Sequence, residues 1–362
     1  MNRRSFLAAS LAAPMIGRGL PAASASGDAL PLRSDHPLQA SWAAWKSLCL
    51  SPEGRVIDGF QENASHSEGQ GYGLVLAAAF GDSAAADRII RWTEANLVRQ
   101  EDGLLSWRWR PEAMPHVTDR NNASDGDLFY AWGLVLAARL GEAEPRLERA
   151  GAIGNALLRA CSAPHPDGSG RLVLLPGIAG FRRNGGIVVN PSYTMGLALR
   201  DLATACQLPD LHRLADSGDA IVAELADRGP VPDWALLTAK GPMEAPAPFS
   251  GVSGYEAVRV PLFALWSGQT QNPAVQRYAT LMKDAGQEGG TPTVFNPAGG
   301  AVFERSTHAG YAAVAALAAC AVADEVGSLM PVFNTDQPYY PATLHLMALV
   351  IQVTNYPKCV PI

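Results

Sequence analysis

Apolar residues recur every three to four positions along most of this 362-residue chain, which is the spacing expected of α-helices. The first such segment places Leu38, Trp42 and Trp45 on one face and ends before Pro52. The same pattern predicts about twelve helices, near residues 36–49, 70–80, 83–98, 127–140, 145–161, 190–205, 208–227, 233–240, 255–267, 272–286, 306–325 and 339–353. Residues 101–109 are expected to form a turn that leads to a short β-like segment. The sequence therefore predicts an all-α protein.

The connections between the predicted helices alternate in length. Short turns such as 81–83 join some helices, whereas the other connections are long and rich in aromatic and polar residues. The long loops are 101–126, 163–189, 241–254 and 288–305. This alternation predicts a toroid of antiparallel helical hairpins with the long loops, and hence the functional site, on one face. No fixed repeat length is visible, so a solenoid is not expected.

Charge and composition narrow the class of ligand. The formal net charge is −6 and the pI is about 5.7, and no basic stripe is available to neutralise phosphates. Nucleic acid is therefore not expected as a partner. Charged residues make up only 17% of the chain, which contains 35 glycines and 27 prolines. This composition favours a compact, loop-rich fold with a neutral, polar ligand.

The N-terminus has the features of an export signal. A twin arginine at 3–4 precedes an alanine-rich stretch, and residues 23–25 form an A-x-A cleavage site. We expect residues 1–25 to be a twin-arginine-type signal that directs the protein to the periplasm or the medium. The apolar stretch is too short to span a bilayer and no later run is long enough, so stable membrane insertion is not expected.

The five cysteines show no C-x-x-C pair, and their odd number leaves at least one thiol unpaired within a monomer. Cys161, Cys206 and Cys320 lie in predicted helices and are expected to be small buried hydrophobes. A bridge between Cys49 and Cys359 is the one pairing considered. The seven histidines show no H-x-x-x-H spacing, so neither a metal nor another cofactor is expected.

One acid stands among alternate glycines in residues 65–73, which read Ser-His-Ser-Glu-Gly-Gln-Gly-Tyr-Gly. Alternate glycines allow a close approach of the backbone to another group. A dinucleotide site requires G-x-G-x-x-G directly after a strand, whereas the spacing here is G-x-G-x-G after polar residues. Nucleotide binding is therefore not expected. Glu68 is either a first-turn acid favoured by the helix dipole or a catalytic carboxylate.

A second acidic cluster, Asp125-Gly126-Asp127, precedes another apolar run. It has three interpretations: helix capping, a metal-holding D-x-D as in nucleotide-sugar transferases, or carbohydrate hydrolysis, in which carboxylates flank the scissile bond. An EF-hand is excluded because Phe129 and Tyr130 occupy positions that require an oxygen ligand and a glycine.

Aromatic residues favour the carbohydrate interpretation. Those in or beside the loops at helix starts are Tyr72, Trp107, Trp109, Tyr130, Trp132, Tyr193, Trp234, Tyr255, Tyr339 and Tyr340. Such rings, placed among Asn, Asp, Arg and Glu, form stacking platforms suited to the apolar faces of pyranose rings. The tryptophans within helical patterns are assigned to the core: Trp42, Trp45, Trp92 and Trp266.

Five motifs, in their order and spacing, resemble glycoside hydrolase family 8. They are the segments 67–73, 123–127, 190–193, 231–234 and the Tyr-acid-Ala-x-Arg-x-Pro stretch at 255–261. Within the family, the chain is most similar to bacterial endoglucanases associated with cellulose synthesis. The resemblance implies an (α/α)6 barrel formed as one catalytic domain by residues 26–362, with a glycan-binding cleft on its loop face. It also implies an inverting mechanism and a β-1,4-glucan substrate.

Carried onto this sequence, the resemblance implies that Glu68 is the general acid and that Asp125 holds the sugar at the cleavage point. The family's usual base is an aspartate in a Tyr-Asp-Ala-x-Arg motif, and Glu256 occupies that position here. The extra methylene moves the carboxylate by on the order of 1 Å, a shift that affects catalysis when the geometry is tight. Glu256 is the expected base, with Asp127 and Asp233 as alternatives.

The expected substrate contacts are Tyr72, Trp107, Asn190, Tyr193, Trp234, Tyr255 and Arg259. Arg259, one helical turn beyond Glu256, is expected to pair with it and keep it ionised, to fix the helix start, or both. The expected partner is a β-1,4-glucan polysaccharide or oligosaccharide, with a functional association with cellulose synthase machinery. The alternatives are a glucan-binding protein without efficient catalysis, and a family-8 hydrolase acting on xylan, mixed-linkage glucan or chitosan.

Overall fold

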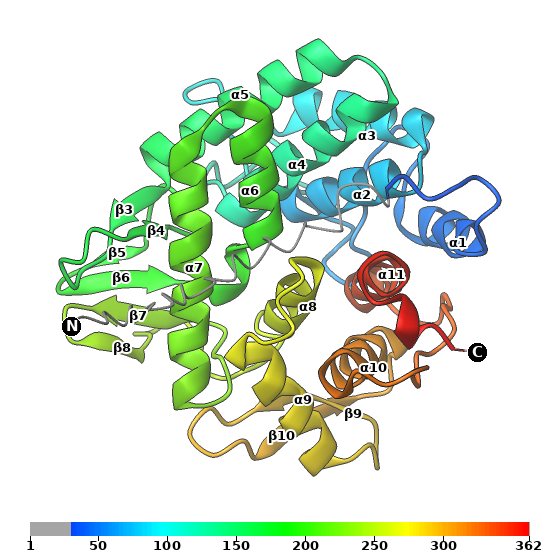
Figure 1. Ribbon diagram of the computed structural model, residues 1–362. Coiled ribbons are helices and arrows are strands. Elements are labelled where there is room, and N and C mark those ends of the chain that lie inside the picture. The colour runs from blue at the N-terminus through cyan, green and yellow to red at the C-terminus, as the bar shows by residue number, and fades with distance from the viewer. Residues whose placement is uncertain (1–29, 362) are drawn as a thin grey trace, which may run out of the picture.

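The computed structural model describes residues 30–361. The expected export signal, residues 1–25, lies outside this part of the chain. Eleven α-helices dominate the described residues (Figure 1): α1 (Gln39–Cys49), α2 (Ser67–Ala79), α3 (Ser83–Asn96), α4 (Ser124–Ala137), α5 (Ala143–Ala160), α6 (Gly196–Cys206), α7 (Pro209–Arg228), α8 (Arg259–Trp266), α9 (Pro273–Ala285), α10 (Ala309–Ala323) and α11 (Tyr339–Asn355). Within residues 30–361, none of these helices is long and apolar enough to cross a membrane.

The helices form an (α/α)6 barrel, so the predicted all-α toroid is confirmed. The inner ring consists of α2, α4, α6, α8, α10 and α11, and the outer helices are α3, α5, α7, α9 and α1. Every residue of α4 and α8 is buried, whereas α3 and α9 bury only one face, as their positions in the two rings require. The first helix, α1, packs on the last, α11, and so closes the ring. Between α10 and α11, the connection 324–338 is irregular and takes the place of a sixth outer helix.

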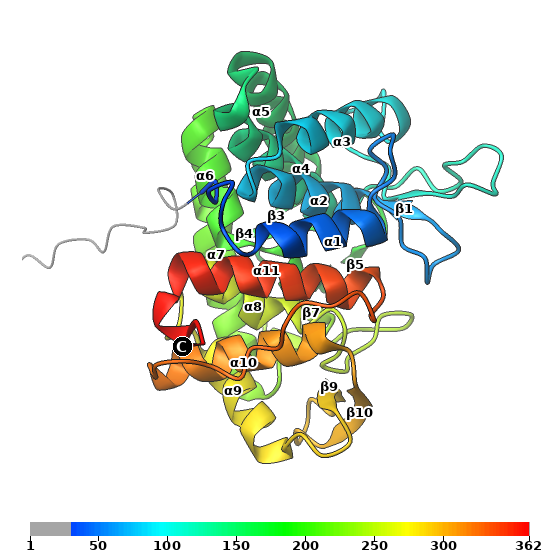
Figure 2. The same ribbon diagram turned by 90° about the vertical axis from the view of Figure 1, so that its right-hand side faces the viewer.

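The long loops lie at the face where the inner helices begin (Figure 2). Within residues 30–361, the connections between helices carry ten short strands: β1 (Ser65–His66), β2 (Arg108–Trp109), β3 (Ser162–Pro164), β4 (Leu172–Leu174), β5 (Arg182–Arg183), β6 (Gly186–Val189), β7 (Ala235–Thr238), β8 (Gly241–Glu244), β9 (Thr291–Phe295) and β10 (Val302–Ser306). The short β-like segment expected after the turn in 101–109 is confirmed as β2, which pairs antiparallel with β1.

The helix predicted at 233–240 is wrong. Residues 235–238 form β7, which lies between β6 and β8 in a four-stranded antiparallel sheet. The turn into β8 uses Gly241 at φ +106°, a conformation that glycine adopts without strain. A run as short as Ala235-Leu236-Leu237 has no periodicity that distinguishes a strand from a helix, and pairing with the neighbouring strand β6 determined the outcome.

The cysteine predictions need correction as well. Cys320, at the end of α10, forms a disulfide with Cys359, just after α11. Cys320 is therefore not a free buried hydrophobe, and the bridge between Cys49 and Cys359 is not formed. Cys49 ends α1 at the loop face, whereas Cys359 lies at the opposite end of the barrel (Figure 2). Cys49, Cys161 and Cys206 are free thiols.

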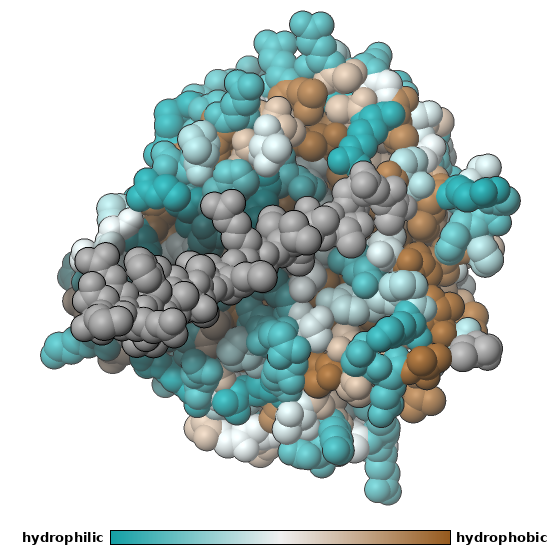
Figure 3. All heavy atoms as spheres, viewed as in Figure 1, coloured by the Kyte–Doolittle hydropathy of each residue, from teal (hydrophilic) through white to brown (hydrophobic). Residues whose placement is uncertain are grey.

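The end of the barrel opposite the long loops is largely polar (Figure 3). Hydrophobic residues gather along the right-hand edge of this view. The irregular connection 324–338 contributes the exposed side chains of Val326, Leu329 and Val332. The outer helices α7 and α9 bury their apolar residues on one face.

Candidate active site

Two acids are brought together by the close crossing of α2 and α4. Glu68 and Asp125 are each the second residue of their helix, and both helices begin at the loop face. A Cβ atom at Gly71 would lie 2.8 Å from the backbone nitrogen of Tyr130, and one at Gly126 would lie 2.8 Å from that of Glu68. The expected close approach of backbone is confirmed at Gly71, whereas Gly69 and Gly73 lie against side chains. The glycines let the two helix starts, and hence the two acids, face the same space.

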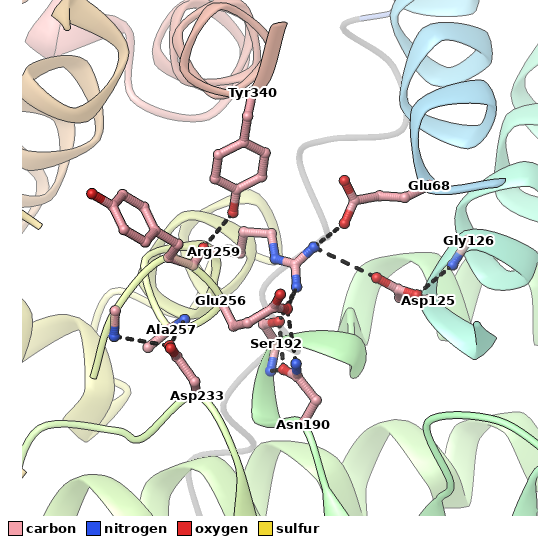
Figure 4. A network of polar contacts seen from close by, with 12 residues as sticks. Glu68, Asp125, Gly126, Asn190, Ser192, Asp233, Glu256, Ala257, Arg259 and Tyr340 are labelled. Atoms are coloured by element: carbon pink, nitrogen blue, oxygen red, sulfur yellow. Dashed lines mark hydrogen bonds and ion pairs between the residues drawn. The ribbon is translucent and has the colours of Figure 1, made fainter. Parts of the chain in front are cut away.

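Arg259, the first residue of α8, joins these acids to a third (Figure 4). Its Nη1 donates to Oε2 of Glu68 and lies 3.5 Å from Oδ2 of Asp125. Its Nη2 donates to Oε2 of Glu256 and, at 2.8 Å, to Oγ of Ser192. The expected pairing of Arg259 with Glu256 is confirmed. The pairing with Glu68 was not anticipated, and it makes this buried guanidinium the centre of the site.

The shared guanidinium limits how far apart two of the carboxylates lie. Nη1 and Nη2 of one guanidinium each donate to one of these acids, so the bound oxygens of Glu68 and Glu256 are separated by at most about 8 Å, the sum of two ordinary hydrogen bonds and the width of the guanidinium. Inverting glycosidases hold their carboxyl groups about 6.5–9.5 Å apart to seat a water molecule. The arrangement is thus compatible with inversion.

Burial changes the acidity of this cluster. Burial raises the pKa of Glu68; Arg259 opposes the shift, whereas the nearby Asp125 and Glu256 reinforce it, and the pKa stays above its ordinary value. The pKa of Asp125 is also raised by burial, with Arg259 opposing the shift. A carboxyl group that stays protonated into a higher pH range suits the role of a general acid.

A cleft of about 450 Å³ opens above these residues. Glu68, Asp125, Glu256 and Arg259 all line it. Its aromatic lining consists of Phe60, Trp107, Tyr193, Tyr255, Tyr311 and Tyr340. Rings arranged around a few convergent polar groups are typical of a site for a sugar chain. A cleft is therefore present on the loop face, where the glycan-binding cleft was expected.

The predicted contact residues within this cleft are held by further interactions. Trp107 stacks on His66, with ring centroids 5.9 Å apart, and donates from Nε1 to Asp119 at 2.9 Å. The ring of Tyr193 lies against the guanidinium of Arg259, 5.6 Å from its centroid. Tyr255 is 43% exposed, and its hydroxyl donates to Glu304. These rings are available to a ligand in the cleft.

Three other predicted contact residues lie outside the cleft lining. Tyr72 is fully buried and accepts a 3.2 Å hydrogen bond from Arg259, so it supports the cluster from below. Asn190 is buried and donates to Glu256 at 2.8 Å. Trp234 packs among other aromatic rings beside Tyr193. The sequence thus placed these three residues near the cleft correctly, but it did not show in which direction their side chains point.

The two alternative bases are occupied by structural hydrogen bonds. Asp127 accepts from the backbone of Leu105 at 2.7 Å and from Asn122 at 2.8 Å, and burial raises its pKa to about 7. Asp233 accepts from the backbone nitrogens of Gly254 and Ala257, both at 2.8 Å, and burial raises its pKa to about 6. Neither residue lines the cleft.

The D-x-D interpretation also conflicts with this geometry. Asp125 turns toward Arg259 and Asp127 turns toward Leu105 and Asn122, so the two carboxylates do not converge. Over residues 30–361, no group of three or more His, Cys, Asp or Glu side chains is arranged to hold a metal ion.

The sequence did not predict several residues that line the cleft. Phe60 and His66 precede α2, and Tyr311 lies in the first turn of α10. Tyr311 packs against Tyr255, with centroids 5.9 Å apart. Tyr311 could have been predicted from its position, because it lies in the first turn of an inner helix. The inner helices α2, α4 and α8 carry Glu68, Asp125 and Arg259 in their first turns.

Comparisons with known proteins agree with this architecture. The family model described as Glycosyl hydrolases family 8 matches residues 28–354. A probable endoglucanase from Novacetimonas hansenii is 30% identical over 312 residues, which cover 85% of this chain and 89% of that protein. An endoglucanase from Cellulomonas uda is 34% identical over 230 residues, and this alignment spans 63% of each chain, just under two thirds.

Solved structures show the same fold. The endo-beta-1,4-glucanase CMCax from Acetobacter xylinum superposes with a TM-score of 0.79 and 27% identity over 88% of this chain and 98% of that one. A family 8 endoglucanase from Klebsiella pneumoniae gives a TM-score of 0.77 and 29% identity over 87% of this chain and 99% of that one. With a family match over most of its length and an acid cluster at the starts of its inner helices, the chain belongs to glycosyl hydrolase family 8.

Proposed function

We propose that this glycoside hydrolase cleaves internal β-1,4-glucosidic bonds of cellulose-like glucans with inversion. The observation that carries the proposal is the placement of Glu68 and Glu256 on the two arms of Arg259, within a cleft lined by aromatic rings. The relatives named endoglucanases support the same substrate class.

In the proposed reaction, Glu68 donates its proton to the glycosidic oxygen as the bond from that oxygen to the anomeric carbon breaks. Glu256 takes a proton from a water molecule, whose oxygen forms the new bond to the anomeric carbon from the opposite face. The configuration is therefore inverted. Arg259 and Asn190 both donate to Oε2 of Glu256, which leaves Oε1 free of these two donors to bind the water.

The remaining residues would hold the substrate. Asp125, beside Glu68, would bind the hydroxyls of the sugar at the cleavage point and favour its distortion. Trp107, Tyr193 and Tyr255 would stack on neighbouring sugar rings. Tyr72 would act through Arg259, which it contacts, rather than by touching the sugar.

The test is the release of reducing ends from carboxymethylcellulose by the mature protein, with Glu68→Gln and Glu256→Ala beside it. We expect each substitution to lower kcat by about 10²- to 10⁴-fold, the usual contribution of a general acid or base. Glu288→Gln, an exposed acid outside the cleft, is the matched control and should behave as the parent. Proton NMR of the first products should show the inverted anomer.

Two alternatives have distinct outcomes in the same experiment. A parent that binds cello-oligosaccharides but releases no reducing ends is a glucan-binding protein. A parent that prefers xylan, mixed-linkage glucan or chitosan over carboxymethylcellulose has a different substrate within the same family.

We further propose that residues 1–25 export the catalytic domain, residues 26–362, to the periplasm or the medium. Replacing both arginines at 3–4 by lysine should retain the protein in the cytoplasm, as judged by cell fractionation. The proposed functional association with cellulose synthase machinery rests on the resemblance. It predicts that a cell producing only the Glu68→Gln variant makes altered amounts of cellulose.

A further inference from the structure

A second hollow adjoins the cleft. It has a volume of about 360 Å³ and lies between the end of α1, the loop 57–60 and the segment leading into α11. Phe60 and Pro338 line both hollows, so the two lie side by side at these residues. Figure 2 shows the end of α1, the blue loop that follows it and the start of α11 on the same, loop-bearing side.

Phe60 stands at the junction of the two hollows on a well-held turn. Its side chain is 79% exposed. The buried Asp58 accepts from the backbone nitrogen of Phe60 and from Nε2 of Gln61, both at 3.0 Å. Asp58 also pairs through its backbone with Ala64, which closes the base of the loop. An aromatic ring presented to solvent by such a turn is pre-positioned for stacking, because little conformational entropy is lost when a ligand binds.

The second hollow has the chemistry of a site for sugar rings. Leu48 and Ile57 supply apolar surface, and His308, Thr335 and Asp336 supply polar groups. Apolar surface with a few polar groups matches a pyranose ring, which has apolar faces and hydroxyls around its edge. The residues that line this hollow include Asp336 and His308 but no lysine or arginine. The hollow therefore has no cluster of positive charge that would attract an anionic ligand.

We propose that the second hollow binds the continuation of the β-1,4-glucan chain beyond the cleft, with Phe60 as the stacking platform at the junction. The position of the second hollow identifies the occupant, because it adjoins the cleft at the exposed Phe60, and a glucan chain that leaves the cleft over this ring reaches the second hollow next. The inference rests on the proposed function, since the cleft must hold a glucan for its continuation to reach Phe60.

The test measures binding of cello-oligosaccharides of increasing length by calorimetry, in the Glu68→Gln background to prevent cleavage. Phe60→Ala should weaken binding of the longest soluble oligosaccharide by about two- to tenfold relative to a short one, as expected for one lost aromatic contact. Leu48→Gln, on the α1 side of the hollow, should shift the same ratio in the same direction. Phe303→Ala removes an exposed phenylalanine that lines neither hollow, and should leave the ratio unchanged.

The outcomes separate the two proposals. If oligosaccharides bind and the parent cleaves them, but neither Phe60→Ala nor Leu48→Gln changes the dependence on length, the extended site is overturned and the proposed function stands. If no oligosaccharide of any length binds, the proposed function itself fails. Thermal unfolding of each variant shows whether it is folded, and a folded Phe60→Ala with a reduced length dependence supports the extended site.

Discussion

The side-chain amide of Asn190 donates a 2.8 Å hydrogen bond to Oε2 of Glu256, although the two residues are 66 positions apart in the chain. Asn190 is itself held, because its Oδ1 accepts from both the backbone nitrogen and the hydroxyl of Ser192. Arg259 donates to the same oxygen, so two side chains fix the position of the Glu256 carboxylate. Both donors thus meet the carboxylate at the position that the glutamate side chain gives it.

Restoring the family's usual aspartate should therefore not improve the enzyme. Glu256→Asp withdraws the carboxylate by about 1 Å from Asn190 and Arg259, and a displacement of this size costs about 100-fold in rate when geometry is tight. We expect kcat to fall with little change in KM, measured by steady-state kinetics on a soluble cello-oligosaccharide. A Glu256→Asp variant as active as the parent would show that the backbone readily adjusts to the shorter side chain.

The alkaline fall of kcat/KM should lie at a higher pH than an ordinary glutamate would give. Glu68 must be protonated to act as the acid, so kcat/KM falls as the pH rises through its pKa in the folded enzyme. Burial raises this pKa, so the fall should occur at a higher pH than for an ordinary glutamate. Asp125→Asn removes a negative charge that also raises the pKa, and should move the fall to lower pH in addition to reducing the rate. A fall at unchanged pH would contradict the assignment of Glu68.

Gly126→Ala should damage both stability and activity. The added Cβ would lie 2.3 Å from Oγ of Ser67 and 2.8 Å from the backbone nitrogen of Glu68, so α2 and α4 must separate. Overpacking against backbone should cost about 2 to 3 kcal/mol in the free energy of unfolding, measured by urea denaturation. Gly299→Ala, which meets nothing within 4 Å, is the matched control. Equal stability of the two variants would refute the tight crossing.

Substitutions at Asp233 should separate a structural role from a catalytic one. Its Oδ1 accepts from Gly254 and Ala257 on either side of Glu256, and the amide oxygen of Asp233→Asn can accept both bonds. We expect this variant to keep activity within a few-fold, whereas Asp233→Ala should lose about 2 kcal/mol of stability and much of its activity. Near-complete inactivity of a folded Asp233→Asn would instead identify Asp233 as the base.

The disulfide should stabilise the end of the barrel opposite the cleft. It joins Cys320 and Cys359, which are 39 positions apart, and a loop of this length corresponds to about 4 kcal/mol in the chain-entropy description. Cys359→Ser should lower the Tm and make it insensitive to reducing agent, while Cys206→Ser, which removes a free thiol, should keep the sensitivity. An unchanged Tm in Cys359→Ser would count against this role.

The amino-acid sequence by itself determined the features that depend on near neighbours in the chain. Helical periodicity is a local property, so segments such as 83–98 and 208–227 were located to within two residues of α3 and α7. The glycines after Glu68 indicated a close backbone approach, because the absence of a side chain is visible in the sequence. Motif order also indicated the family and the acids Glu68, Asp125 and Glu256.

The tertiary structure alone decided the features that depend on partners far along the chain. Residues 235–238 became a strand because β6 lies beside them, and Cys359 bonds to Cys320 because α10 and α11 end at the same face. Tyr72 turned inward beneath Arg259, whereas Phe60 turned outward to the rim of the cleft. Side-chain direction at the start of a helix depends on how the neighbouring helices pack around it, and no local pattern in the sequence specifies that packing.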